Sequence, residues 1–366
     1  MSKQINELKI STPGRVCLFG EHQDYLKLPI VACAISLRIS IDGIRRDDMI
    51  INIQMPDIGD KETLKLDEKI IYTKERDYFK SSINILKKHG FTFSNGFDCK
   101  IEGKIPINAG TSSSSALIIT WLNFLVRISD QAARLSPEEL AQYGYEAEVL
   151  EFSEPGGMMD HYSTAIGGII ALDFDPSIKV TKLNTKLGTF VLGNSNQPKN
   201  TKYILSHVKN QIVDVDRILK TKYPDFSLKN ITVDELQKFH LDLNDDQFRI
   251  LEGTIKNRDL TIVARKELSK ENPDHKLIGK LLNEHHTVLR DVLEISTPKI
   301  DRMIDAALKA GAYGAKINGS GGGGCMFAYT PENPENVKSA IEGAGGEAFI
   351  IIPDSGSEEE VIEIKT

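Results

Sequence analysis

Several common features are scarce or absent in this 366-residue chain. Its cysteines, Cys17, Cys33, Cys99 and Cys325, are scattered and form no CxxC pair, so we predict reduced, mostly buried thiols rather than a disulfide or zinc framework. The longest nearly apolar run, residues 116–126, is far too short to span a membrane. The first residues carry no signal-peptide core. We therefore expect a cytoplasmic protein with no membrane partner.

The chain also lacks an excess of positive charge. Its formal net charge is −7, with 40% hydrophobic and 27% charged residues, which is typical of a folded globular protein. The negative charge and the lack of a basic patch with interleaved aromatic residues argue against a nucleic-acid partner. No Walker A loop is present. A phosphate-binding site would therefore need positive potential concentrated locally.

The order of the predicted elements indicates an α+β protein with two domains. Strand-like runs rich in Val, Ile and Leu dominate the first part of the chain, and helical patterns dominate the second half. Residues 114–129 and 136–152 are predicted to form helices that follow the first strands. The length is too great for one ordinary core. A seam is expected near residues 175–200, where turn-forming residues cluster.

The first segment with chemical character, which we call the serine loop, is Pro106-Ile-Asn-Ala-Gly-Thr-Ser-Ser-Ser-Ser-Ala116. Small residues let a ligand approach the backbone, and the free N–H groups of a following helix attract anions. Serine hydroxyls can also ligate magnesium. The loop is therefore a candidate site for ATP phosphates, although a helix cap in a glycine-serine turn would explain the same residues.

A second segment, the glycine segment, is Gly319-Ser-Gly-Gly-Gly-Gly-Cys325. Such a run is costly to order, because glycine loses more conformational entropy on folding than any other residue. A loop that wraps a ligand and a flexible linker would both justify it. The apolar, strand-like flanks favour the loop that covers a ligand.

The third segment, residues 14–25, places Glu21, His22 and Asp24 just after an apolar strand. Such a cluster suits a polyhydroxylated ligand, because each hydroxyl group can use both a donor and an acceptor. A solvated turn would have the same composition. The local sequence does not decide between the two.

The three segments occur in one chain and in this order, and together they resemble the signatures of the GHMP kinases, most of all the galactokinases. Residues 14–25 differ at three positions from the galactokinase pattern G-R-V-N-L-I-G-E-H-T-D-Y. Pro106, Gly110 and residues 112–114 match the phosphate loop P-x-G-G-G-L-S-S-S-A. Residues 314–324 match G-A-x-x-T-G-G-G-F-G-G.

Two further stretches extend the resemblance to nearly the whole chain. Residues 147–160 parallel A-E … P-C-G-I-M-D, and residues 286–301 parallel H-x-x-L-R-D … S-C-P-E-L-D. The resemblance implies the α+β, two-domain GHMP kinase fold. It has an N-terminal domain like domain 2 of ribosomal protein S5, a ferredoxin-like C-terminal domain and the active site in the cleft between them. We expect residues 1–190 and 191–366 to form these domains.

The resemblance also implies an activity, the magnesium-dependent transfer of the γ-phosphate of ATP to the anomeric hydroxyl of galactose or a closely related sugar. Asp160 aligns with the catalytic base, and Arg15 with the arginine that neutralises the moving phosphoryl charge. The expected sugar-binding residues are Glu21, His22, Asp24, Gly157 and, as a displaced substitute, Tyr203. The expected ATP phosphate-binding residues are Gly110, Thr111, Ser112, Ser113, Ser114, Gly321 and Gly322. The expected magnesium ligands are Ser113 and Glu148.

The chain departs from the galactokinase pattern beside the sugar site. Residues 26–29 read Leu-Lys-Leu-Pro where galactokinases continue with Asn-Gly-Gly. After Asn196 the family's sugar-contacting tyrosine is displaced to Tyr203, and its arginine pair is absent. Lys199 and Lys202 add positive charge there. A different sugar, such as a uronic or an amino sugar, is therefore an alternative substrate.

A non-catalytic sensor is the alternative from another class, because some galactokinase relatives bind ATP and sugar and act through a protein partner. A sensor is free to lose Asp160 or Arg15, or to insert residues into the serine loop. All of these are intact here, which favours an enzyme. We expect ATP, Mg²⁺ and a small sugar as ligands, and a monomer or weak dimer.

Overall fold

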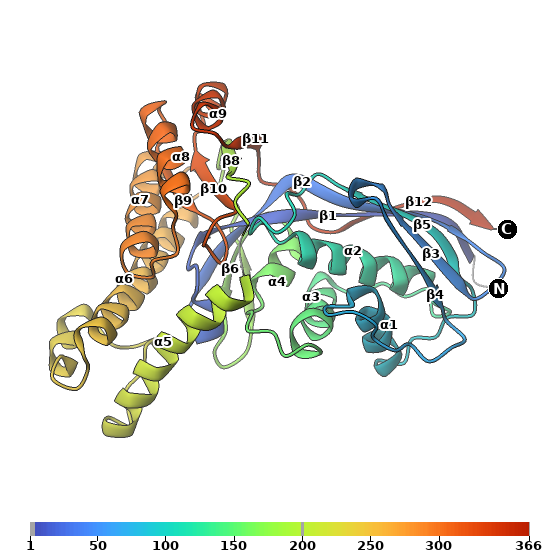
Figure 1. Ribbon diagram of the computed structural model, residues 1–366, viewed down its shortest axis with the longest axis horizontal. Coiled ribbons are helices and arrows are strands. Elements are labelled where there is room, and N and C mark those ends of the chain that lie inside the picture. The colour runs from blue at the N-terminus through green and yellow to red at the C-terminus, as the bar shows by residue number, and fades with distance from the viewer. Residues whose placement is uncertain (1–3, 199–200, 366) are drawn as a thin grey trace.

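The computed structural model, which describes residues 4–198 and 201–365, divides the chain into two lobes built around separate β-sheets (Figure 1). All four cysteines are buried free thiols, as predicted. Within the described ranges, no helix is both long enough and apolar enough to cross a membrane. The two lobes meet near the middle of the long axis of the molecule.

The first lobe is a sheet with helices on one face (Figure 1). Its strands are β1 (Gln4–Phe19), β2 (Ile30–Arg45), β3 (Ile50–Met55), β4 (Asp60–Lys65), β5 (Phe97–Gly103), β6 (Ile169–Asp173), β7 (Lys179–Lys182) and β12 (Glu358–Lys365). They follow the order β12-β1-β2-β5-β3-β4, with β6 on β2 and β7 on β6. The helices are α1 (Tyr78–Lys88), α2 (Ser113–Ile128), α3 (Pro137–Tyr145) and α4 (Met159–Ile166).

Helix α2 is the central helix of this lobe because it is apolar on almost every side after its first turn. It packs against β1, β2 and the other three helices of the lobe. The ring N–H of its Trp121 donates to the carbonyl oxygen of Phe79 in α1 at 3.1 Å, which satisfies the polar atom of a buried side chain. The serine-rich start of α2 is thus held firmly where the lobes meet.

The second lobe is a four-stranded antiparallel sheet flanked by longer helices. Its strands are β8 (Phe190–Asn194), β9 (Gly314–Ile317), β10 (Cys325–Tyr329) and β11 (Glu347–Ile351). Its helices are α5 (Thr201–Lys222), α6 (Asp245–Leu268), α7 (His275–Asp291), α8 (Pro298–Lys309) and α9 (Pro334–Gly343). The strand order β11-β8-β10-β9 is that of a ferredoxin-like β-α-β-β-α-β unit, which confirms the predicted fold class.

One apolar cluster spans the junction of the two lobes. It combines Phe19 and Val31 of the first sheet with Phe190 and Phe327 of the second and with Leu260 of α6. Interiors packed in this way deform little. The relative position of the two lobes is therefore set by packing as well as by the chain connections.

The boundaries or the sheet membership of the elements differ from the sequence expectation at three places. Strand β12 returns to the first sheet and pairs with β1, so residues 358–365 join the first lobe rather than the domain predicted for residues 191–366. The sequence pattern also predicts a strand over residues 166–174, whereas in the structure α4 ends at Ile166 and the strand, β6, begins at Ile169. The helix predicted over residues 136–152 ends in a π-helical turn, Glu146–Leu150.

Candidate active site

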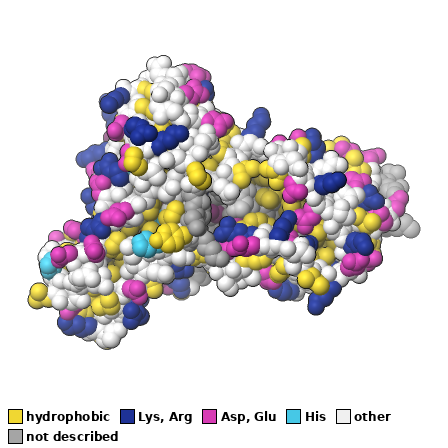
Figure 2. Space-filling view, in the orientation of Figure 1, with side chains coloured by type: hydrophobic (Ala, Val, Ile, Leu, Met, Phe, Trp, Pro, Cys, Tyr) yellow, Lys and Arg dark blue, Asp and Glu magenta, His cyan; other side chains and the backbone are white. Residues whose placement is uncertain are grey.

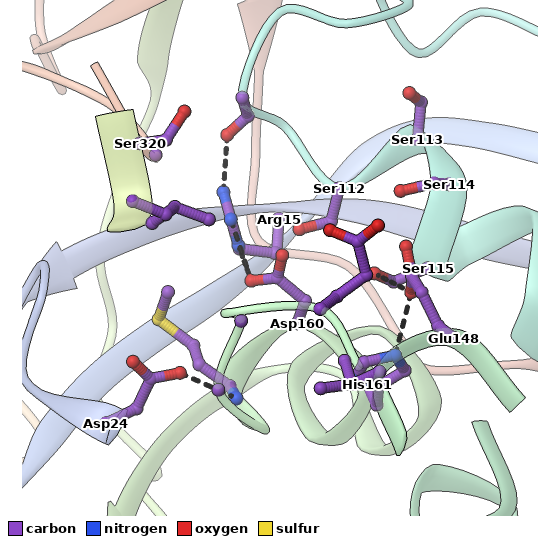
Figure 3. Close-up of a pocket in the computed structure, with 18 of the residues that line it drawn as sticks. Arg15, Asp24, Ser112, Ser113, Ser114, Ser115, Glu148, Asp160, His161 and Ser320 are labelled. Atoms are coloured by element: carbon purple, nitrogen blue, oxygen red, sulfur yellow. Dashed lines mark hydrogen bonds and ion pairs between the residues drawn. The ribbon is translucent and has the colours of Figure 1, made fainter. Parts of the chain in front are cut away.

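A polar hollow lies where the two lobes meet (Figure 3). Its walls come from the end of β1 and the turn after it, the serine loop, the π-helical turn and the approach to α4. Gly319 and Ser320 of the glycine segment and Leu205 of α5 also line it. The three segments singled out from the sequence therefore meet in one place, between the lobes.

Arg15 and Asp160 form an ion pair at the centre of this hollow (Figure 3). Arg15 Nε and Nη2 lie 2.8 and 2.7 Å from Asp160 Oδ1, and Nη1 donates to the carbonyl oxygen of Gly110 at 2.5 Å. Because the ion pair uses Oδ1, the second carboxylate oxygen, Oδ2, lies outside it. Arg15 thus ties the predicted catalytic base to the serine loop.

Asp24 and Asp160 influence each other, and their pKa values move in opposite directions. Burial alone would raise the pKa of the Asp160 carboxyl, but the charge of Arg15 and its hydrogen bond hold that pKa below its ordinary value. Burial, and next the charge of Asp160, raise the pKa of Asp24 to about 6. At neutral pH the hollow therefore contains an ionised Asp160 beside a carboxyl that takes up a proton near pH 6.

Asp24 is held against the start of α4. Its Oδ1 accepts a hydrogen bond from the backbone N–H of Tyr25 at 2.9 Å, and its Oδ2 accepts one from Met159 at 3.3 Å. Gly157 permits this approach, because a Cβ atom there would lie 1.9 Å from Asp24 Oδ2. Asp24 and Gly157, both predicted to bind sugar, therefore line the hollow side by side.

Glu21 reaches the wall of the hollow, but the protein itself engages its carboxylate. Lys316 Nζ pairs with one oxygen, and the backbone N–H of Gly319 donates to the other. Glu21 is 1% exposed and Lys316 is completely buried. The contact joins the turn after β1 to β9, so this predicted sugar ligand also connects the two lobes.

His22 likewise bonds to protein groups on both sides of the junction. Its Nε2 lies 3.2 Å from the carbonyl oxygen of Ser320, and a carbonyl only accepts, so we assign the ring proton to Nε2. Nδ1 then accepts from the hydroxyl of Tyr25 at 2.9 Å. The carboxylate of Asp24, by contrast with that of Glu21, has no cationic partner among the described residues and accepts hydrogen bonds from two backbone N–H groups.

The serine loop presents part of its predicted phosphate site to the hollow. Ser112 has a left-handed backbone conformation, with φ at 60°, and lies beside Asp160 (Figure 3). Ser113 and Ser114 form the first turn of α2 and also line the hollow. Thr111 does not line it; its side chain is fully buried, and its carbonyl oxygen accepts from the N–H of Arg15 at 3.1 Å.

Glu148 of the π-helical turn faces the same hollow (Figure 3). Its Oε2 accepts hydrogen bonds from Ser115 Oγ and from His161 Nε2, each at 2.7 Å. Sequence reasoning did not single out Ser115 or His161. The available signals were a fourth consecutive serine in the loop and a histidine directly after Asp160.

The donor set fits a magnesium–nucleotide complex better than a free metal ion. No group of three or more His, Cys, Asp and Glu side chains in the described ranges could hold a metal by itself. Magnesium usually takes one or two carboxylates and completes its shell with phosphate oxygens and water. Glu148 and the hydroxyl of Ser113 supply oxygens of that kind beside the start of a helix, where phosphates bind well.

A second ion pair also lines the hollow. Arg76 Nε and Nη2 donate to Glu154 Oε1 and Oε2 at 3.0 and 2.9 Å. Tyr78, at the start of α1, lies beside the pair, and burial raises the pKa of its hydroxyl. These residues were not predicted from the sequence, since nothing in their local pattern distinguishes them from a surface ion pair.

Besides Thr111, three predicted ligand residues do not line the hollow. Gly321 and Gly322 turn toward the loop before α8, where the N–H of Gly322 donates to the carbonyl oxygen of Ile295 at 2.7 Å. Tyr203 is 65% exposed and lines a separate hollow, with its ring stacked on His207. Lys199 lies outside the described residues, as does the side chain of Lys202.

Three sequence models match separate parts of the chain. Residues 3–41 match the galactokinase galactose-binding signature, residues 77–168 match the GHMP kinases N terminal domain, and residues 264–348 match GHMP kinases C terminal. The fold and the site define a two-domain phosphotransferase. The chain belongs to the GHMP kinases, which transfer phosphate from ATP to small molecules.

Curated relatives carry two different names. Mevalonate kinase of Thermococcus onnurineus is 28% identical over 357 residues, covering 94% of this chain and 96% of that protein. Galactokinase of Haemophilus influenzae is 26% identical over 363 residues, covering 93% and 89%. Sequence identity alone therefore does not separate the two substrate classes.

Solved structures share the fold. Lactococcus lactis galactokinase complexed with galactose superposes with a TM-score of 0.84 at 22% identity, covering 96% of this chain and 95% of that one. Methanococcus jannaschii mevalonate kinase superposes with a TM-score of 0.72, also at 22% identity, covering 95% and 98%. Both likenesses cover almost the entire chain, including both lobes.

Proposed function

We propose that this protein is a sugar kinase that phosphorylates the anomeric hydroxyl of galactose or a closely related neutral sugar. The observation that carries the proposal is the Arg15–Asp160 pair next to Asp24, at the junction of the lobes. The pair supplies a carboxylate that stays ionised, and Asp24 supplies a second acceptor for hydroxyl groups. The galactokinase galactose-binding signature over residues 3–41 supports the same substrate class.

In this proposal Asp160 is the general base. Its Oδ2, outside the ion pair with Arg15, accepts the proton of the attacking hydroxyl as the bond to phosphorus forms. Arg15 keeps the carboxylate ionised before the reaction and offsets the charge of the phosphoryl group as it moves. Asp24, held by the N–H groups of Tyr25 and Met159, orients the sugar through its other hydroxyls.

The serine loop binds the nucleotide phosphates. The N–H groups in the first turn of α2 and the hydroxyls of Ser113 and Ser114 face the hollow and would contact phosphate oxygens. Magnesium, held by Ser113 and Glu148, would neutralise phosphate charge and fix its geometry. The phosphates and the sugar would then meet beside Asp160.

The charges that line the hollow support a neutral substrate over a carboxylated one. Among its described lining residues the Lys and Arg side chains are Arg15 and Arg76, and each is paired with a carboxylate. Mevalonate and uronic acids carry a carboxylate that needs an available cation. A polyol instead needs acceptors such as Asp24.

The first test is a coupled ADP-release assay with Mg·ATP and a panel of acceptors: galactose, galactosamine derivatives, galacturonate, arabinose, fucose, glucose and mevalonate. We expect turnover on galactose or another neutral sugar, and about 10³-fold slower turnover in Asp160→Asn, which retains the shape but not the base. The acceptor hydroxyl is then identified by phosphorus NMR of the product.

Other outcomes would replace the proposal. Turnover on mevalonate or galacturonate alone would overturn the neutral-sugar assignment. No turnover on any acceptor, combined with tight binding of both ATP and a sugar, would indicate a sensor. Undiminished turnover in Asp160→Asn would remove Asp160 from the role of base.

A further inference from the structure

Two side chains hold the carboxylate of Glu148 in one orientation. Ser115 and His161 donate to the same oxygen, Oε2, at 2.7 Å each, and come from different elements, α2 and α4 (Figure 3). All three residues are at least nine-tenths buried. A carboxylate fixed through one oxygen by two donors has little rotational freedom.

The backbone that carries Glu148 is also unusual. Helix α3 passes into the π-helical turn Glu146–Leu150, in which the N–H of Glu151 donates to the carbonyl oxygen of Glu146 at 3.0 Å. The extra residue in a π turn changes which side chains face a given direction, and such turns are frequent at functional sites. Here the turn brings Glu148 to the hollow between the buried neighbours Ala147 and Val149.

The ring of His161 is itself held in place by packing. Its ring is 1% exposed and lies edge to face with Tyr145, with the ring centroids 5.9 Å apart. It directly follows Asp160, so the first turn of α4 carries both the proposed base and the donor to Glu148. A change in the position of α4 would therefore move both groups together.

We infer that Ser115 and His161 are positioning residues that orient Glu148 toward the metal ion of the metal–ATP complex. Because both donors use Oε2, the other oxygen, Oε1, is left for the cation. No hydrogen bond from the described residues reaches Oε1. Groups that orient a metal ligand typically contribute ten- to hundredfold to metal affinity. The inference rests on the proposed function for the presence of a divalent cation at Glu148.

The test measures binding without turnover and without sugar. Isothermal titration calorimetry would give the Kd of a non-hydrolysable ATP analogue with and without Mn²⁺, for the wild type and three variants. In the wild type, Mn²⁺ should strengthen nucleotide binding. In His161→Leu and Ser115→Ala that strengthening should fall about tenfold or more, with the metal-free Kd changed less than twofold. His161→Gln, which keeps a donor near Nε2, should retain most of it.

A matched control is available on the same π-helical turn. His89 Nε2 contacts Glu146 Oε2 at 2.8 Å outside the hollow, so His89→Leu also removes a His–Glu contact and should leave the effect of Mn²⁺ unchanged. Thermal unfolding of each variant would show that it is folded. The inference is overturned if folded His161→Leu and Ser115→Ala keep the full effect of Mn²⁺, or if His161→Gln loses as much as His161→Leu.

The two hypotheses can fail separately. If no neutral sugar is phosphorylated but the variants lose the effect of Mn²⁺, the positioning role stands and the substrate assignment fails. If a sugar is phosphorylated while the effect of Mn²⁺ survives in both variants, the substrate assignment stands and the positioning role fails.

Discussion

The serine loop and the glycine segment are both rich in small residues but contribute to the hollow in different ways. The serine loop presents hydroxyl groups and the start of α2 to the hollow. The glycine segment presents Gly319 and Ser320, whose backbone groups already bond to Glu21 and His22. The remainder of the segment turns away, and the N–H of Gly322 bonds to Ile295.

The difference shows that small residues can allow either a ligand or a second backbone segment to approach closely. Asn318, just before the glycine segment, donates to the carbonyl oxygen of Gly110 at 2.8 Å and accepts from the N–H of Cys17 at 2.9 Å. We call these contacts of Asn318 with Gly110 and Cys17 the clamp; because Gly110 also accepts from Arg15, the clamp reaches the Arg15–Asp160 ion pair. The serine loop thus faces the hollow, while the glycine segment connects the two lobes.

The largest effect should come from breaking the buried ion pair beside the glycine segment. In Lys316→Met, the carboxylate of Glu21 would stay buried without its cation, and Cys17 would lose a hydrogen bond of 2.8 Å to its carbonyl oxygen. We expect the free energy of unfolding to fall by about 3–5 kcal/mol. Urea unfolding at pH 7 would measure it.

The double variant Glu21→Gln/Lys316→Met is the matched control, because it removes both charges. It should recover much of the lost stability. A loss below about 1 kcal/mol in Lys316→Met would show that the pair does not hold the lobes. A folded Glu21→Gln that changes only the KM for sugar would restore Glu21 to the predicted role of sugar ligand.

A side chain at Gly319 should separate the lobes. The residue has φ at +77°, and a Cβ atom would lie 2.6 Å from the carbonyl oxygen of Gly110. Gly90→Ala is the control, since Gly90 has φ at +86° with nothing within 4 Å of its Cβ position. We expect Gly319→Ala to lose about 2 kcal/mol more than Gly90→Ala in thermal unfolding. Equal losses would mean that backbone strain, not the clamp, governs this position.

The sequence predicted the parts of this molecule that depend on local pattern or on a family signature. The ferredoxin-like second lobe and the gathering of Asp24, Gly157 and Asp160 are of that kind. Contacts between distant segments that no family signature joins were not predictable. The pairing of Glu21 with Lys316 joins residues almost 300 positions apart, and the π-helical turn Glu146–Leu150 depends on how α3 packs, not on its composition.

A smaller effect should follow from removing one hydroxyl from the serine loop. Ser113→Ala would lose an oxygen that, in the proposed function, contacts the phosphates and the metal, and hydrogen bonds to charged groups contribute about 1.5–3 kcal/mol. We expect the KM for Mg·ATP to rise about tenfold, measured at saturating sugar. Ser320→Ala should change it less, because the contact of Ser320 with His22 uses its backbone carbonyl. If Ser320→Ala raised the KM for Mg·ATP more than Ser113→Ala did, the glycine segment rather than the serine loop would be the one that contacts the phosphates.

The smallest expected effect tests whether the carboxylate of Asp24, which lines the hollow, lowers the stability of the protein when it is ionised. Because the native pKa of Asp24 is raised to about 6, the folded protein binds a proton that the unfolded chain releases near pH 4. The stability from this group is therefore greatest in acid and is lost as the pH rises through 6. Between pH 5 and pH 8, the wild type should lose about 1 kcal/mol relative to Asp24→Asn in urea unfolding. If the wild type and Asp24→Asn differed in free energy of unfolding by the same amount at both pH values, Asp24 would be ionised throughout this range. Its carboxylate would then be stabilised as well as the buried groups of the clamp are.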